Sequence, residues 1–154
     1  MIRRAKAEDG FVAGAESLAF GVLIFVLGTL LIVNLWAVVD ARFATSAAAR
    51  EAVRAATATN ADAGAGAALA AARQAAAVAL AGHGIDPGRA QVVPVGALRL
   101  ERCAEVTMRV ALTVPALVLP GIGRGTAAFE VVGEHREVVE PYRSGLAGEV
   151  DCAY

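Results

Sequence analysis

The feature that most constrains this chain is an uninterrupted run of 23 uncharged residues near its N-terminus. The run lies between Glu16 and Asp40 and reads SLAFGVLIFVLGTLLIVNLWAVV. As an α-helix it would extend about 35 Å at 1.5 Å per residue, which is enough to cross the hydrocarbon core of a bilayer. We therefore predict a transmembrane helix over 17–39, with Asn34 and Trp36 close to the outer membrane interface.

The charges around this run predict its orientation. Lys and Arg occupy three of the first six positions, whereas the first charged residues after the run, Asp40 and Arg42, are of opposite sign. Positive charge collects on the cytoplasmic side of a membrane helix, so residues 1–16 should form a cytoplasmic leader. This predicts a single-pass protein of the cell membrane with an extracytoplasmic C-terminal domain.

A cleaved secretory signal is the rival interpretation of the same segment. Basic residues, an apolar run and the small residues 45–47 follow one another in the order that such signals use. The apolar region of a signal peptide holds about 7 to 15 residues, however, and the present run is longer. A twin-arginine signal fits less well, because Glu8 and Asp9 follow the arginine pair.

Alanine dominates the chain beyond the apolar run and predicts two exported helices in the segment 40–88. Residues 40–57 contain neither Gly nor Pro, and alanine has the highest helix propensity, so the first helix should continue through them as a stalk. Turn-forming residues interrupt the pattern at 57–66, and a second helix is expected over 67–81. One face of the half-exposed stalk carries Ala41, Ala44, Ala48, Ala52 and Ala55.

The C-terminal part of the chain changes to Val, Leu and Thr with an apolar period of two, which predicts β-strands. We expect an edge strand over 91–101, because Pro94 cannot donate a hydrogen bond to a central ladder. Further strands are expected over 103–114 and 126–139, the last with a bulge-type irregularity at Gly133. The apolar face of the second strand carries Val106, Met108, Val110, Leu112 and Val114.

The segment 89–154 is thus expected to form an exported domain built on an antiparallel sheet of about three strands. With the long transmembrane and stalk helix and the short second helix, it predicts a membrane-anchored α+β fold. The connection 114–125, VPALVLPGIGRG, is unusually apolar for a surface loop. Two interpretations stay open for it: a strand extension packed on the stalk, or a loop that contacts lipid or a partner subunit.

Both cysteines, Cys103 and Cys152, lie in the part of the chain expected to be exported. An oxidising compartment favours a disulfide between them over two free thiols. The bond would close a loop of nearly 50 residues and stabilise the fold by about 4 kcal/mol in the chain-entropy model. It would also tether the tail 141–154, which is too irregular and glycine-rich to hold itself in place.

Charge and motifs argue against several classes of function. The net charge of -1 and the pI of about 6.1 provide no basic patch for nucleic acid. Neither His83 nor His135 has a metal-binding spacing, and no serine has the neighbourhood of a catalytic nucleophile. We therefore expect no enzymatic activity, no metal or other cofactor, and no small-molecule substrate.

Two features of the apolar run are candidates for assembly. Gly14, Gly21 and Gly28 recur every seven residues and would share one face, which lets membrane helices approach closely, although glycine is also common in such helices. Glu16 stands at the edge of the run, where a carboxylate is costly unless it meets a cation or reaches water. An assembly role and a plain interfacial position both stay open for Glu16.

The first third of the chain resembles the TadE-like pseudopilins of tight-adherence pili. The resemblance covers about residues 10–56 and includes Gly10 after a short leader, Glu16 at the start of an apolar helix, and the stalk motif AAREAVR at 48–54. In that family a prepilin peptidase cleaves after the glycine, which would make Phe11 the new N-terminus, and the glutamate helps the filament to assemble.

The resemblance implies a minor, non-catalytic, pseudopilin-like subunit for tight-adherence pilus assembly. Its partners would be other pilus subunits, bound through the transmembrane helix, together with a prepilin peptidase and the lipid bilayer. The alternative is an unprocessed single-pass protein that anchors an exported binding or adhesion module.

Overall fold

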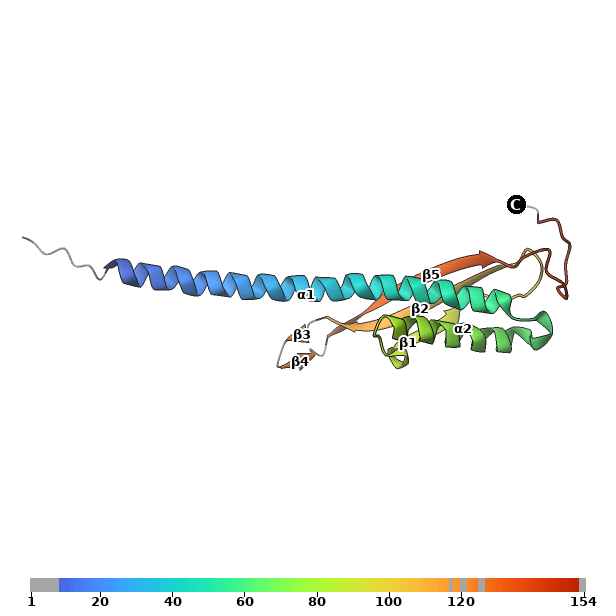
Figure 1. Ribbon diagram of the computed structural model, residues 1–154, viewed down its shortest axis with the longest axis horizontal. Coiled ribbons are helices and arrows are strands. Elements are labelled where there is room, and N and C mark those ends of the chain that lie inside the picture. The colour runs from blue at the N-terminus through green and yellow to red at the C-terminus, as the bar shows by residue number, and fades with distance from the viewer. Residues whose placement is uncertain (1–8, 117, 120–121, 125–126, 153–154) are drawn as a thin grey trace, which may run out of the picture.

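A single helix, α1 (Asp9–Ala58), runs through most of the length of the computed structural model (Figure 1). The structure describes the backbone of residues 9–116, 118–119, 122–124 and 127–152, and their side chains except those of 9–16 and 124. The second helix is α2 (Gly64–Gly82), and the strands are β1 (Ala90–Pro94), β2 (Glu105–Pro115), β3 (Val118–Leu119), β4 (Gly123–Arg124) and β5 (Ala128–Val138). The predicted combination of a long apolar helix, a second helix and a three-stranded antiparallel sheet is confirmed.

The first helix continues without a break from the apolar run into the alanine-rich stalk, as predicted. It ends at Ala58, where the Arg143 guanidinium donates hydrogen bonds to the carbonyls of Thr57 and Ala58. These carbonyls have no partner within the helix, and a cation is favourable at this end of the helix dipole. The second helix begins at Gly64, three residues before the predicted start, because a short 3-10 turn leads directly into it.

The strands pair in the antiparallel order β1-β2-β5, so β1 is an edge strand, as Pro94 predicted. The strand β1 ends at Pro94, however, and the prediction that it continues to residue 101 is wrong. Gly96 adopts a φ of 87° and turns the chain away from the sheet after the last bond, from the Val95 N–H to the Thr107 carbonyl. A smaller two-stranded ladder joins β3 to β4.

The predicted bulge at Gly133 is wrong, because β2 and β5 pair residue for residue through Val110 and Gly133. Glycine is required there for a different reason. A Cβ atom at this position would lie 2.7 Å from the backbone nitrogen of Ser46 and closer still to the carbonyl group of Thr45. The backbone of α1 therefore rests directly on β5, and any side chain at residue 133 would push the helix off the sheet.

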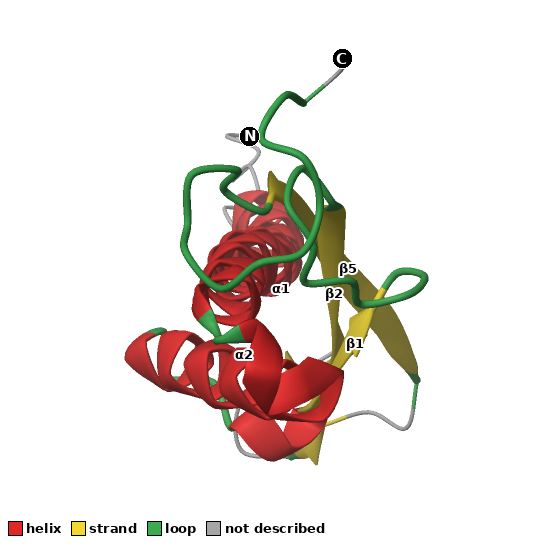
Figure 2. Cartoon of the chain, turned by 90° about the vertical axis from the view of Figure 1, so that its right-hand side faces the viewer, coloured by secondary structure: helices red, strands yellow, loops and turns green. Residues whose placement is uncertain are grey.

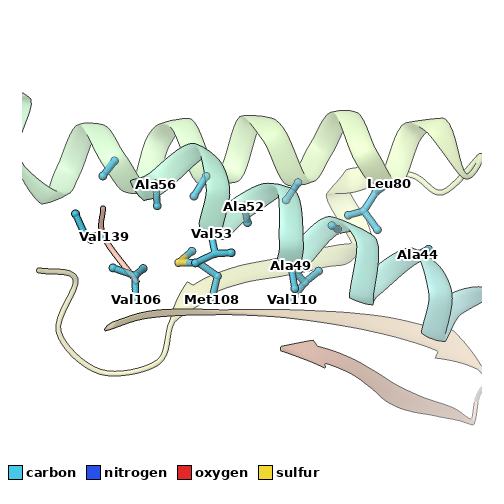
Figure 3. Packing of buried hydrophobic residues seen from close by; sticks show 14 of the residues in the cluster. Ala44, Ala49, Ala52, Val53, Ala56, Leu80, Val106, Met108, Val110 and Val139 are labelled. Atoms are coloured by element: carbon cyan, nitrogen blue, oxygen red, sulfur yellow. The ribbon is translucent and has the colours of Figure 1, made fainter. Parts of the chain in front are cut away.

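The two helices lie side by side over one face of the three-stranded sheet, and the core fills the space between them (Figure 2). In Figure 3, Val53 of α1 lies above Met108 and Val106 of β2. Most of the other buried positions on the helices are alanine, so the core is thin and depends on close backbone approach. The main cluster contains Ala44, Ala48, Ala49, Ala52, Val53, Ala56, Ala68, Ala72, Ala76, Leu80, Val106, Met108, Val110, Val139 and Leu146.

The buried faces of β2 and of the stalk largely match the sequence pattern. All five apolar positions of β2, from Val106 to Val114, are buried, while Arg109 and Thr113 face outward. On the stalk four of the five alanines named above are buried, but Ala55 is only partly so, and Ala49, Val53 and Ala56 complete the face. The wider face arises because the helix contacts α2 as well as the sheet.

The tail after Pro141 is held by more than the cysteine at its end, so the expectation that it cannot hold itself in place is wrong. Leu146 is buried in the main cluster. The backbone N–H of Arg102 donates to the carbonyl of Ala147 at 2.9 Å, and its guanidinium donates to the carbonyl of Gly148 at 3.0 Å. These contacts lie about 45 residues apart in sequence, which local composition does not reveal.

Candidate functional site

Residues 17–39 of α1, called the apolar segment below, form a helix whose side chains are mostly left uncovered by the rest of the chain. None of these residues is buried, and the exposed fraction reaches 70% or more at Phe25, Leu31 and Trp36. Large apolar side chains rarely stay this open over a whole helix in a water-soluble protein. The apolar segment is consistent with a single-pass membrane anchor.

A second helical segment, Ala61–Gly82, is also long and apolar enough to cross a membrane. It differs because one face packs into the core of the domain through Ala68, Ala72 and Leu80. This packing marks α2 as a core helix of the domain.

Two of the three glycines predicted to form an assembly face lie in the described part of the apolar segment. A Cβ atom added at Gly21 or Gly28 would meet no atom within 4 Å, so there is open space beside both glycines. The other candidate positions are Gly10, Phe11, Gly14 and Glu16. Their backbone belongs to α1, but their side chains lie outside the described residues, so the processing and assembly roles stay predictions.

One polar side chain of the apolar segment has a partner far away in the sequence. The amide oxygen of Asn34 accepts a hydrogen bond from the Val118 N–H at 2.8 Å, and its nitrogen lies 3.5 Å from the Val118 carbonyl oxygen. The same nitrogen donates to the carbonyl of Leu30 at 2.8 Å. A single asparagine thus serves both backbone polar groups of one residue, in the way that a neighbouring strand would.

Sequence reasoning missed this contact, which we call the Asn34 clasp. The clasp attaches the β3–β4 ladder, called the hairpin below, to the apolar segment, and Figure 1 shows the hairpin beside the middle of α1. Of the two interpretations left open for 114–125, a strand extension packed on the stalk is wrong, because β3 and β4 form a separate small sheet that contacts Asn34. Two signals pointed here: Asn34 was the strongest polar interruption of the run, and 114–125 was the most apolar connection.

The structure brings Cys103 and Cys152 to disulfide distance, with their Cα atoms 5.3 Å apart. Cys103 has a φ of 62°, a left-handed conformation that is uncommon for a residue with a side chain. Its N–H donates to the carbonyl of Val139 at 3.1 Å, and this bond helps to hold the turn before β2. The pair joins the start of β2 to the tail, at the end of the domain away from the hairpin.

The outer face of the sheet carries exposed ion pairs between neighbouring strands. Arg109 pairs with Glu134 directly across the ladder, and Arg136 pairs with Glu105 at 3.1 Å. Such exposed pairs add little stability, but they keep this face polar and limit association through it. Most of the large exposed apolar side chains lie on α1, and only a few, such as Val93 and Phe129, lie on the three-stranded sheet.

Among the residues that the structure describes, no group of three or more His, Cys, Asp or Glu side chains could hold a metal ion. No family model, curated protein or solved structure matches the chain. The features that can support a function are thus the uncovered apolar segment, the Asn34 clasp and the domain that α1 carries at its other end.

Proposed function

We propose that this protein is a non-catalytic structural subunit anchored in the cell membrane by its apolar segment. The observation that carries the proposal is the contrast along α1: none of residues 17–39 is buried and most are exposed, while the stalk is packed into a folded domain. In water it costs free energy to expose leucine and phenylalanine, whereas in a bilayer a helix can expose them to lipid without this cost. The basic N-terminus favours a cytoplasmic leader and an exported domain.

Within this class, we propose a pseudopilin-like role in tight-adherence pilus assembly. The resemblance over residues 10–56 supports the role, and so does the open face at Gly21 and Gly28, which leaves room for a second helix. Glu16 would supply a charge for a neighbouring subunit, and a prepilin peptidase would cleave between Gly10 and Phe11. The partners are then other pilus subunits within the membrane.

The test is the mass of the N-terminal peptide of protein isolated from membranes, with and without a prepilin peptidase. We expect a chain that begins at Phe11 only when the peptidase is present, and Gly10→Val should abolish the difference. Gly21→Val is the matched control, because it adds the same side chain beyond the cleavage site. An unchanged mass in both strains contradicts the pilus role and leaves the membrane anchor intact.

Two observations favour the alternative of an unprocessed, anchored binding or adhesion module. Glu16 follows Gly10 by six residues, whereas the TadE-like pattern has five. The Asn34 clasp also occupies one side of the apolar segment, so other helices cannot pack around that part of α1 on every side. In this alternative the leader stays attached, and the protein does not co-purify with pilus subunits.

A further inference from the structure

The Asn34 clasp fixes the position of the hairpin along α1. Asn34 precedes Asp40, the first charged residue after the apolar segment, by six positions, which correspond to about 9 Å along a helix. Because Val118 is hydrogen-bonded to Asn34, it lies beside the apolar segment, short of its C-terminal end, and not beside the stalk. The distance of Val118 from the charged end of the apolar segment is the same whichever end of α1 faces the cytoplasm.

We propose that the hairpin inserts into the bilayer beside α1, so that the protein enters the lipid at two places. The inference rests on the proposed membrane anchor but not on the pilus role. The hairpin would be surrounded by lipid of the leaflet that lies next to the folded domain. The hairpin would then fix the height and the rotation of the domain on the membrane surface, which a single helix leaves free.

The composition of the hairpin suits a lipid environment. No charged residue occurs between Arg109 and Arg124, a stretch of fourteen residues. At the turn of the hairpin Ile122 is 83% exposed, and Val118 is exposed as well. Moving an isoleucine this exposed out of water is favourable, by roughly 25 cal/mol for each Å² of apolar surface.

The hydrogen bonding also suits the hydrocarbon region. Unpaired backbone groups there are costly, and the edge of β3 that faces α1 has its polar groups paired. The strands β3 and β4 pair with each other, and the Asn34 clasp takes up the N–H and the carbonyl of Val118. In return, the hairpin provides hydrogen-bond partners for the side-chain amide of Asn34, which would otherwise be an unpaired polar group facing lipid. Each partner therefore lowers the free-energy cost of placing the other in lipid.

Lipid fits this surface better than a protein partner because the exposed hairpin continues the exposed surface of the apolar segment. Trp36 lies two residues after Asn34 and is 71% exposed, at the level where an indole favours the membrane interface. The hairpin and the helix therefore present one continuous apolar belt.

The chain offers a clean test because Trp36 is its only tryptophan. The full-length protein is reconstituted into phosphatidylcholine vesicles with and without brominated acyl chains, which quench tryptophan at short range. Trp36 of the unmodified protein reports on the anchor. The combination Trp36→Phe with Ile122→Trp places the reporter on the hairpin, and Trp36→Phe with Tyr142→Trp places the control at the far end, where Tyr142 is 80% exposed.

We expect brominated lipid to quench the hairpin reporter about as strongly as Trp36, with blue-shifted emission and little quenching by aqueous acrylamide. The control reporter should behave in the opposite way. Adding Asn34→Leu to the hairpin variant should reduce its quenching by lipid, because the clasp is lost. If Trp36 is quenched and the hairpin reporter is open to acrylamide, the insertion is wrong and the anchor stands.

The remaining outcomes are equally decisive. The hairpin reporter could instead show blue-shifted emission and be quenched neither by brominated lipid nor by acrylamide. That result would mean that protein, and not lipid, covers the hairpin, and the proposal would be wrong. If neither Trp36 nor the hairpin reporter is quenched by brominated lipid, both the anchor and the insertion are wrong.

Discussion

The two halves of α1 belong to one helix but reverse the usual relation between side-chain size and burial. In the apolar segment the large residues, such as Phe25 and Leu31, are exposed. In the stalk the buried residues are mostly alanines, such as Ala48 and Ala52, which are fully covered. In water, large apolar side chains belong inside because they bury the most area. The reversal shows that burial against protein is not what stabilises the apolar segment.

The stalk stabilises the fold in a different way from a conventional core. Each alanine buries little area, but it allows the backbones of α1, α2 and β5 to approach closely. Gly133 is the extreme case, because no side chain at all fits between β5 and the turn of α1 at Thr45. The stalk is thus intolerant of added volume, whereas the apolar segment has no protein neighbour to clash with over most of its surface.

The strongest way to break this comparison is Gly133→Val. Valine favours strands, but its Cβ would overlap the α1 backbone at Thr45 and Ser46, so the helix cannot lie on β5. We expect the domain to lose more than about 5 kcal/mol, which exceeds the usual range for a single substitution. Denaturant unfolding of the full chain in detergent measures this loss. Gly66→Ala, on the open surface of α2, should instead stabilise by about 0.5 to 1 kcal/mol.

The next largest effect is expected from Cys103→Ser combined with Cys152→Ser. The cysteines are 49 positions apart, and removing their bond should lower the free energy of unfolding by about 4 kcal/mol in the chain-entropy model. The native fold should persist at low denaturant, because Leu146 and Arg102 still hold the tail. Equal unfolding midpoints with and without reductant in the unmodified protein would show that no bond forms.

A pair of leucine substitutions compares the two halves directly. Ala52 is fully buried between the helices and the sheet, so Ala52→Leu should destabilise the domain by about 1 to 3 kcal/mol through overpacking. Ala37 is exposed in the apolar segment, and Ala37→Leu should leave domain unfolding unchanged. If both variants behave alike, the distinction between the halves of α1 is not one of packing.

The smallest predicted effect is local to the hairpin. Asn34→Leu removes both hydrogen bonds to Val118, each worth about 1 kcal/mol, so amide exchange at Val118 should rise about 30-fold. The amide of Met108 in the central strand should keep its protection, because no core contact changes. Unchanged exchange at Val118 would mean that the hairpin stays in place without the clasp. Hydrogen exchange read by mass spectrometry or NMR measures both sites.

Features with a regular local period could be predicted from the sequence. The apolar run, the alanine stalk and the alternation of β2 predicted two helices, a central strand and its buried face. Contacts between distant residues could not be predicted in this way. Asn34 and Val118 are 84 positions apart, and the need for glycine at residue 133 comes from a turn of α1 at Thr45. Local sequence cannot distinguish a glycine that bends a strand from one that admits a helix backbone.

The candidate site shows the same limit. Its apolar segment and its open glycine face follow from composition, whereas the attachment of the hairpin depends on how the sheet is positioned along α1. The Arg143 cap is another example, because the residue lies 86 positions from the carbonyl of Thr57. The tail carried no periodic signal, so its role in holding the end of α1 was visible only in the fold.

The most direct test of the central claim is photolabelling of the purified chain in vesicles that contain a diazirine phospholipid, mapped residue by residue by mass spectrometry. We expect lipid adducts on all sides of α1 within 18–27, and none on the buried face of the stalk at Ala44, Ala48 or Ala52. If the apolar segment carries no adducts, or if the buried face of the stalk is labelled as strongly as the apolar segment, the claim that lipid surrounds the first half of α1 while protein covers the second is wrong.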